Sequence, residues 1–113
     1  MKIEQTIKDK EVEREKDGVK LDLELPAQSE YFDGHFDGFP ILPGVVQIQL
    51  VQKYAEKYFD IQFPITQISH LKFIKPIFPS QIIQLSLQNF NDERITFEIT
   101  RDFILCAKGI LKK

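Results

Sequence analysis

The residue best suited to chemistry in this chain is His35, which stands in an aromatic stretch framed by glycine and proline. Residues 31–45 read Tyr-Phe-Asp-Gly-His-Phe-Asp-Gly-Phe-Pro-Ile-Leu-Pro-Gly-Val. A neutral imidazole can take a proton from the carbon next to a carbonyl group. Gly44 stands where a helix is predicted to begin, and the first N–H groups of a helix lack internal partners and carry partial positive charge. Because glycine has no side chain, a carbonyl oxygen can approach those groups and be polarised.

These residue types suit proton abstraction or elimination on an acyl thioester. The alternative interpretation of His35 is a packed loop histidine that is hydrogen-bonded to the backbone. The stretch itself is too aromatic for a solvated linker, so it must pack against something, and long packed loops often carry function.

One helix is predicted directly after this stretch, over residues 44–59. The apolar residues follow helical spacing and are expected to form its buried face, with polar residues on the other side: Val45, Ile48, Val51, Ala55, Tyr58 and Phe59. Proline is tolerated at the start of a helix, and Pro64 lies beyond its end.

The other elements are predicted to be strands, because apolar and polar residues alternate in them. The predicted strands cover residues 19–25, 65–75, 83–88, 95–100 and 105–111. Residues 1–17 are rich in charge and are typical of either an edge strand or a partly ordered lead-in. One helix cannot cover both faces of a five- or six-stranded sheet, so it must lie on one concave face. Such a sheet keeps an exposed edge, which dimerisation would cover.

Composition and charge limit the classes of protein to which this chain can belong. The chain has 113 residues and a formal charge of -2, which is consistent with one domain over residues 1–113 and gives no basic excess for nucleic acid. No apolar run approaches the roughly 20 residues of a membrane helix, and the charged N-terminus is unlike a signal peptide, so a cytoplasmic location is expected. The single cysteine, Cys106, is expected to be a small packing residue, and no metal site is predicted.

Two motifs resemble the hotdog-fold 3-hydroxyacyl-ACP dehydratases. Residues 34–45 resemble the family pattern GHFP-x-x-P-x-x-PGV, and the variant Phe-Pro-Ile-Leu-Pro-Gly-Val-Val-Gln is similar to dehydratases of the aryl-polyene type. Residues 71–81 resemble the family strand x-x-F-x-x-P-V-x-P-G-D. The resemblance extends over about residues 19–112. It implies an α+β hotdog fold, in which a curved antiparallel sheet wraps around the helix, and a homodimer or higher even oligomer with active sites built from both subunits.

The resemblance also implies roles for individual residues. His35 corresponds to the family's catalytic base, and the N–H of Gly44 to the group that holds the thioester carbonyl. Phe36 and Val45 are expected to contact the substrate. The family's acid is a Glu or Asp fourteen residues after the histidine, and this chain has Gln49 there. An amide has no titratable proton near neutral pH, although it can donate a hydrogen bond or orient a water.

Other candidates have weaker support. Asp33 and Asp37 are more typical of solvated turn residues than of replacement acids, and Glu56 of a surface charge. His70 is expected to be a surface or partly buried strand residue. Phe73, Phe78 and Phe90 either line an acyl tunnel or belong to the core. Lys72, Lys75 and Arg101 are candidates for a basic patch that meets an acidic carrier protein, with a solvated face as the alternative.

The sequence therefore predicts a (3R)-hydroxyacyl-ACP dehydratase-like enzyme that acts on acyl-ACP or acyl-CoA. It needs no bound cofactor, because the phosphopantetheine arm arrives with the substrate. The alternatives are a hotdog thioesterase and a non-catalytic hotdog protein that binds acyl thioesters or depends on a complementary subunit. Gln49 favours the last of these.

Overall fold

The computed structural model describes residues 8–24, 42–59, 67–78, 81–90 and 93–112. His35, Phe36, Asp33 and Asp37 lie outside the described residues, so their predicted roles stay predictions. The described helix and strands, in chain order, are β1 (Lys8–Arg14), β2 (Gly18–Glu24), α1 (Gly44–Phe59), β3 (Gln67–Phe73), β4 (Ile82–Phe90), β5 (Arg94–Arg101) and β6 (Ile104–Lys112).

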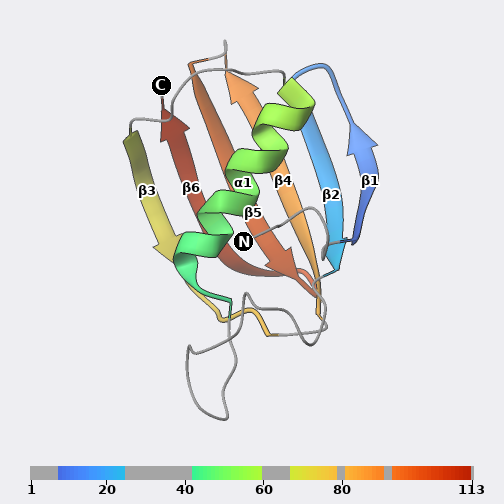
Figure 1. Ribbon diagram of the computed structural model, residues 1–113, viewed down its shortest axis with the longest axis vertical. Coiled ribbons are helices and arrows are strands. Elements are labelled where there is room, and N and C mark those ends of the chain that lie inside the picture. Colours follow the sequence, from blue (N-terminus) through green and yellow to red (C-terminus); the bar gives the residue numbers. More distant parts are fainter. Residues whose placement is uncertain (1–7, 25–41, 60–66, 79–80, 91–92, 113) are drawn as a thin grey trace.

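The strands form one antiparallel sheet in the order β1-β2-β4-β5-β6-β3. α1 lies across one face of this sheet, with its first turn beside the end of β3 and its last turn towards β2 and β1 (Figure 1). The chain thus passes from one edge of the sheet to the other by way of the helix. This arrangement confirms the predicted α+β hotdog architecture, with a curved sheet around one long helix.

The core lies between α1 and the face of the sheet that the helix covers. Strands β2, β4 and β5 alternate buried and more exposed residues, so that every second side chain points to the helix. Register pairs such as Leu21 with Leu85, and Leu87 with Phe97, place buried side chains side by side. Tyr54 and Phe97 are the largest fully buried side chains of the described residues.

The buried face of α1 matches the prediction except at the start of the helix. The predicted bounds of the helix are confirmed, and Val51 and Ala55 are buried, while Ile48, Tyr58 and Phe59 pack against the core. Val45, which was expected on this face, is 67% exposed. The buried residues are Val46, Gln47, Leu50, Val51, Tyr54 and Ala55. The prediction for Val45 was wrong because the first half of α1 is apolar on more than one side, and the sheet buries only the side that it contacts.

Both edges of the sheet are accessible to solvent, but they differ in chemistry. All seven residues of β1 (KDKEVER) are exposed, and most of them are charged. Six of the seven residues of β3 (QISHLKF) are exposed, and they include Ile68, Leu71 and Phe73. Within the part of the chain that the structure describes, no helix is long and apolar enough to cross a membrane.

Candidate functional site

The first turn of α1 presents two amide groups that have no acceptor among the described residues. The carbonyl oxygen of Pro43 accepts hydrogen bonds from the amides of Val46 and Gln47, both at 3.1 Å. The amides of Gly44 and Val45 precede this first helical bond and have no described partner. The first turn also contains no acidic side chain that would offset the positive end of the helix dipole. A negatively polarised oxygen is therefore the natural ligand of this helix start.

Hydrogen bonds on both sides of Leu42 fix the segment that leads into the helix. The amide of Leu42 donates to the carbonyl of Ile77 at 2.8 Å, and both side chains are buried. The segment around Ile77 is itself held by β5 and β6, because Arg101 Nε donates to Pro76 O at 3.1 Å and the amide of Ile74 donates to Cys106 O at 2.7 Å. The helix start is thus tied to the sheet through residues 74–77.

Gln47 provides the second bond to Leu42, and the sequence analysis did not single it out. Its Nε2 donates to the carbonyl of Leu42 at 3.1 Å, and the residue is only 5% exposed. Its Oε1 is buried and has no hydrogen-bond partner in the part of the chain that the structure describes. Such an unsatisfied buried acceptor costs on the order of 1–3 kcal/mol. A polar residue inside the apolar spacing of the helix was the signal that could have identified it.

The aromatic ring of Phe73 lies directly against Gly44. A Cβ atom added to Gly44 would stand 2.8 Å from Cζ of Phe73, closer than side chains pack. Glycine at this position therefore serves the packing of β3 on the helix start, a reason that the sequence analysis did not consider. Val45, Phe73 and Ile74 are exposed, so the two open amides lie beside an apolar surface.

Gln49, the residue at the family's acid position, lies on the exposed side of α1. It follows Val45 by four residues, so the two share one side of the helix. The described part of the chain offers Gln49 no hydrogen-bond partner. Any group that works together with Gln49 must come from residues outside the described ranges, from substrate or from another chain.

The structure also settles several weaker candidates. Glu56 is exposed, His70 is an exposed residue of β3, and Cys106 is buried, as the sequence predicted. Phe73, Phe78 and Phe90 do not belong to the buried core of the chain, so that interpretation was wrong for a single subunit. Each of them keeps more than a third of its surface exposed.

The three basic candidates differ from one another. Lys72 and Lys75 are exposed. Arg101 is half-buried: besides its bond to Pro76, its guanidinium lies 5.9 Å from the centre of the Phe78 ring. A simple solvated face therefore does not describe Arg101, which braces residues 76–78.

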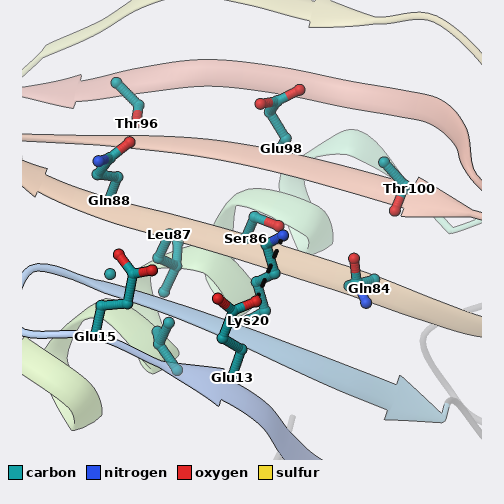
Figure 2. Close-up of a pocket in the computed structure, with 12 residues that line it drawn as sticks. Glu13, Glu15, Lys20, Gln84, Ser86, Leu87, Gln88, Thr96, Glu98 and Thr100 are labelled. Atoms are coloured by element: carbon teal, nitrogen blue, oxygen red, sulfur yellow. Dashed lines mark ion pairs between the residues drawn. The ribbon is translucent and has the colours of Figure 1, made fainter.

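A hollow of about 420 Å³ lies on the face of the sheet opposite α1. None of the candidate residues described above lines it. Figure 2 shows its polar lining on β1, β2, β4 and β5, with α1 behind the sheet. Lys20 and Glu13 form an ion pair across it at 3.8 Å, and Glu15 and Glu98 add two more carboxylates. Its lining has no histidine or cysteine, and the described residues contain no cluster of three potential metal ligands.

Comparisons with known proteins point to the dehydratases. The ApeI-like family, described as ApeI dehydratase, matches residues 10–110. The 3-hydroxyacyl-[acyl-carrier-protein] dehydratase FabZ of Syntrophotalea carbinolica is 31% identical over 75 residues, which cover 59% of this chain. The match spans about half of that relative, 51% of its length.

Solved structures agree on the fold. A chain of the dehydratase heterocomplex ApeI:P from Xenorhabdus doucetiae is 28% identical, with a TM-score of 0.80, over 93% of this chain and 96% of that chain. Thioesterase superfamily member 2 from Mus musculus has a TM-score of 0.69 over 94% of this chain and 80% of that chain, but at 14% identity it shows the fold alone. With its hotdog architecture and a family match over nearly its whole length, the chain belongs to the ApeI-like dehydratase family.

Proposed function

We propose that this protein eliminates water from a (3R)-3-hydroxyacyl thioester carried by an acyl carrier protein. The observation that carries this proposal is the start of α1, where two amides without a described acceptor lie beside an exposed apolar surface in a member of a dehydratase family. The amides suit the thioester carbonyl, and the apolar surface suits the acyl chain.

In the proposed reaction, His35 takes a proton from C2 of the substrate. The N–H of Gly44 stabilises the negative charge that develops on the thioester oxygen. The C2–H electrons form the C2=C3 double bond as the hydroxyl group leaves C3, and Phe36 and Val45 contact the acyl chain. The products are a 2-enoyl thioester and water, and no resident cofactor is required.

The departing hydroxyl group needs a proton, which the amide of Gln49 cannot supply. Two sources remain: the imidazolium of His35, which has just gained the C2 proton, or a carboxyl group of another subunit. Gln49 then serves to orient the hydroxyl group or a water. General acid help is commonly worth about 10²–10⁴ in rate, so the source of this proton decides how active the isolated protein is.

We propose that two chains associate along β3, either as a homodimer or with a complementary hotdog subunit. The exposed Ile68, Leu71 and Phe73 support this proposal, because an apolar edge strand is a template for pairing. The similar chain from Xenorhabdus doucetiae belongs to a dehydratase heterocomplex. That similarity favours a complementary subunit as the second candidate assembly, in which the partner supplies the missing carboxylate.

The carrier is proposed to meet the protein at Lys72 and Lys75, because carrier proteins are generally acidic and both lysines are exposed near the end of β3. A thioesterase activity is the less favoured alternative. It usually requires a carboxylate to activate water, and Gln49 stands where the helix would supply one.

The test is to assay dehydration of 3-hydroxyacyl thioesters and hydration of 2-enoyl thioesters, of short and medium length, on both ACP and CoA. We expect His35→Ala to abolish the activity. Gln49→Glu is expected to raise the rate if the acid is missing. A well-folded wild-type protein without activity on either carrier would contradict the stand-alone enzyme.

A further inference from the structure

The strongest unexplained feature of the molecule is the side chain of Gln47. It is almost fully buried, its Nε2 donates to the carbonyl of Leu42, and its Oε1 has no partner among the described residues. A buried amide with one unsatisfied acceptor is unfavourable compared with an apolar side chain of similar shape, such as methionine. Packing alone therefore does not explain glutamine at this position.

The only described hydrogen bond of the Gln47 side chain acts on the segment before the helix. The Leu42 amide is bound to Ile77 O and the Leu42 carbonyl to Gln47 Nε2, so both peptide groups of this residue are fixed. Gly44, whose amide is open, follows only two residues later. Without the Gln47 bond, Leu42 would keep only its hydrogen bond to Ile77. The peptide groups of Pro43 and Gly44 could then change their orientation relative to α1 more freely.

We propose that Gln47 is a positioning residue that fixes the amides of Gly44 and Val45 for the thioester oxygen. This inference rests on the proposed function and deepens it. Gln47 touches neither substrate nor reacting atoms. It acts through the Leu42 carbonyl, and the unsatisfied Oε1 is a stability cost of keeping an amide there. Natural proteins tolerate such local costs where function requires a fixed geometry.

The first test is Gln47→Met, which keeps the length of the side chain and removes its donor. We expect amide hydrogen exchange at Leu42 and Val46 to become about 5- to 10-fold faster, because one net hydrogen bond is lost. We expect the melting temperature to stay the same or rise. In the enzymatic assay, kcat is expected to fall while KM changes little. Gln52→Met, the same substitution at a half-buried position of α1, is the matched control and should change none of these.

A second variant keeps the test decisive if Gln47→Met folds poorly. In Gln47→Glu, a neutral carboxyl group can donate its O–H to the Leu42 carbonyl, whereas the ionised form cannot. Burial raises the pKa of a carboxyl group. The variant should therefore match the wild type at low pH, and lose protection of Leu42 and activity relative to the wild type as the pH rises through that raised pKa.

The outcomes separate this inference from the proposed function. Unchanged exchange at Leu42 in Gln47→Met would overturn the positioning role, as would a fall in kcat that only follows a fall in melting temperature. An inactive wild-type protein would count against the proposed function instead. In that case, the exchange measurement still decides by itself whether Gln47 holds the start of the helix.

Discussion

The two ends of α1 lie at opposite edges of the sheet and differ in the contacts that the chain makes with them. The C-terminal end lies towards β1 and is held by several side-chain contacts. The N-terminal end lies beside β3 (Figure 1). It presents two amides without an acceptor among the described residues, and exposed apolar side chains next to them.

At the C-terminal end, β1 fastens the helix. The hydroxyl group of Tyr54 donates to Asp9 Oδ2 at 2.9 Å, and Lys57 Nζ lies 3.9 Å from the same carboxylate. Arg14 donates to the carbonyl of Tyr58 at 3.2 Å, with its guanidinium 5.3 Å from the centre of that ring. The cation of Lys57 in the last turn also suits the negative end of the helix dipole.

The two edges of the sheet therefore differ: β1 makes side-chain contacts with α1, whereas β3 exposes apolar side chains to which another chain could bind. The charges of β1 discourage pairing with another strand, and its contacts with α1 complete this side within one chain. The exposed apolar residues of β3, next to the start of the helix, leave the other side incomplete. The candidate site and the proposed subunit contact therefore share one side of the molecule.

The largest effect is expected from Leu71→Lys, which places a charge on the open edge. An unpaired charge buried in an interface should weaken association about 100-fold, or roughly 3 kcal/mol. Sedimentation or light scattering would measure the shift from dimer to monomer. Val12→Lys on β1 is the matched control, because Val12 is also exposed and apolar, and it should not change the mass. Equal effects of the two variants would remove the proposed distinction between the edges.

The next effect is expected from Gly44→Ala at the start of α1. The new methyl group would displace the Phe73 ring and disturb the neighbouring amides, so we expect activity to fall about 10- to 100-fold. The double variant Gly44→Ala/Phe73→Leu relieves the contact with the ring. We expect it to stay slow because the substrate also needs the space at Gly44; full recovery would mean that glycine serves packing only.

At the fastened end, Tyr54→Phe should cost stability without affecting catalysis. It removes the hydroxyl group that donates to Asp9, worth about 1 kcal/mol, which corresponds to a melting temperature lower by about 4–8 °C. Thermal unfolding and the enzymatic assay would be measured on the same samples. Tyr58→Phe is the control and should leave both values unchanged; a loss of activity in Tyr54→Phe would argue against independent ends.

The smallest effect is expected from Lys57→Gln. Its ion pair with Asp9 is long and half-exposed, so solvent screening limits its contribution to about 0.5 kcal/mol or less. Unfolding at low and high salt should show a small difference between variant and wild type that shrinks as salt is added. A fall in the free energy of unfolding of more than about 1 kcal/mol would mean that Lys57 stabilises the fold by more than its ion pair with Asp9.

Local sequence signals predicted the elements and most of the buried face of the helix. The bounds of α1 followed from Pro43, Gly44 and the change of period at Val45, and β2, β4 and β5 followed from strict alternation. On the buried face of α1, only Val45 was predicted wrongly, because apolar residues occupy more than one side of the first half of the helix. For residues 1–17 the sequence allowed either an edge strand or a partly ordered lead-in, because their high charge is typical of both. The structure shows that Lys8–Arg14 form the edge strand β1.

The candidate site was predictable in part. The family motif identified Gly44 and Gln49, and the structure places both in α1, one half-buried and the other exposed. Gln47 was missed although it interrupts the apolar spacing of the helix, because its burial and its bond to Leu42 appear only in the folded chain. The contact between Phe73 and Gly44 joins residues distant in sequence, so no local pattern predicted it.

The sequence by itself determined the order and type of the elements, the family and the substitution of glutamine for the family's acid. These depend on periodicity, turn residues and a short motif, all of which act over a few neighbouring positions. Only the tertiary structure decided that Val45 stays exposed at the start of α1, which edge of the sheet contacts α1 through its own side chains, and that Leu42 is held from both sides. Those features arise from contacts between distant segments, where packing selects one of several arrangements that the local sequence allows equally well.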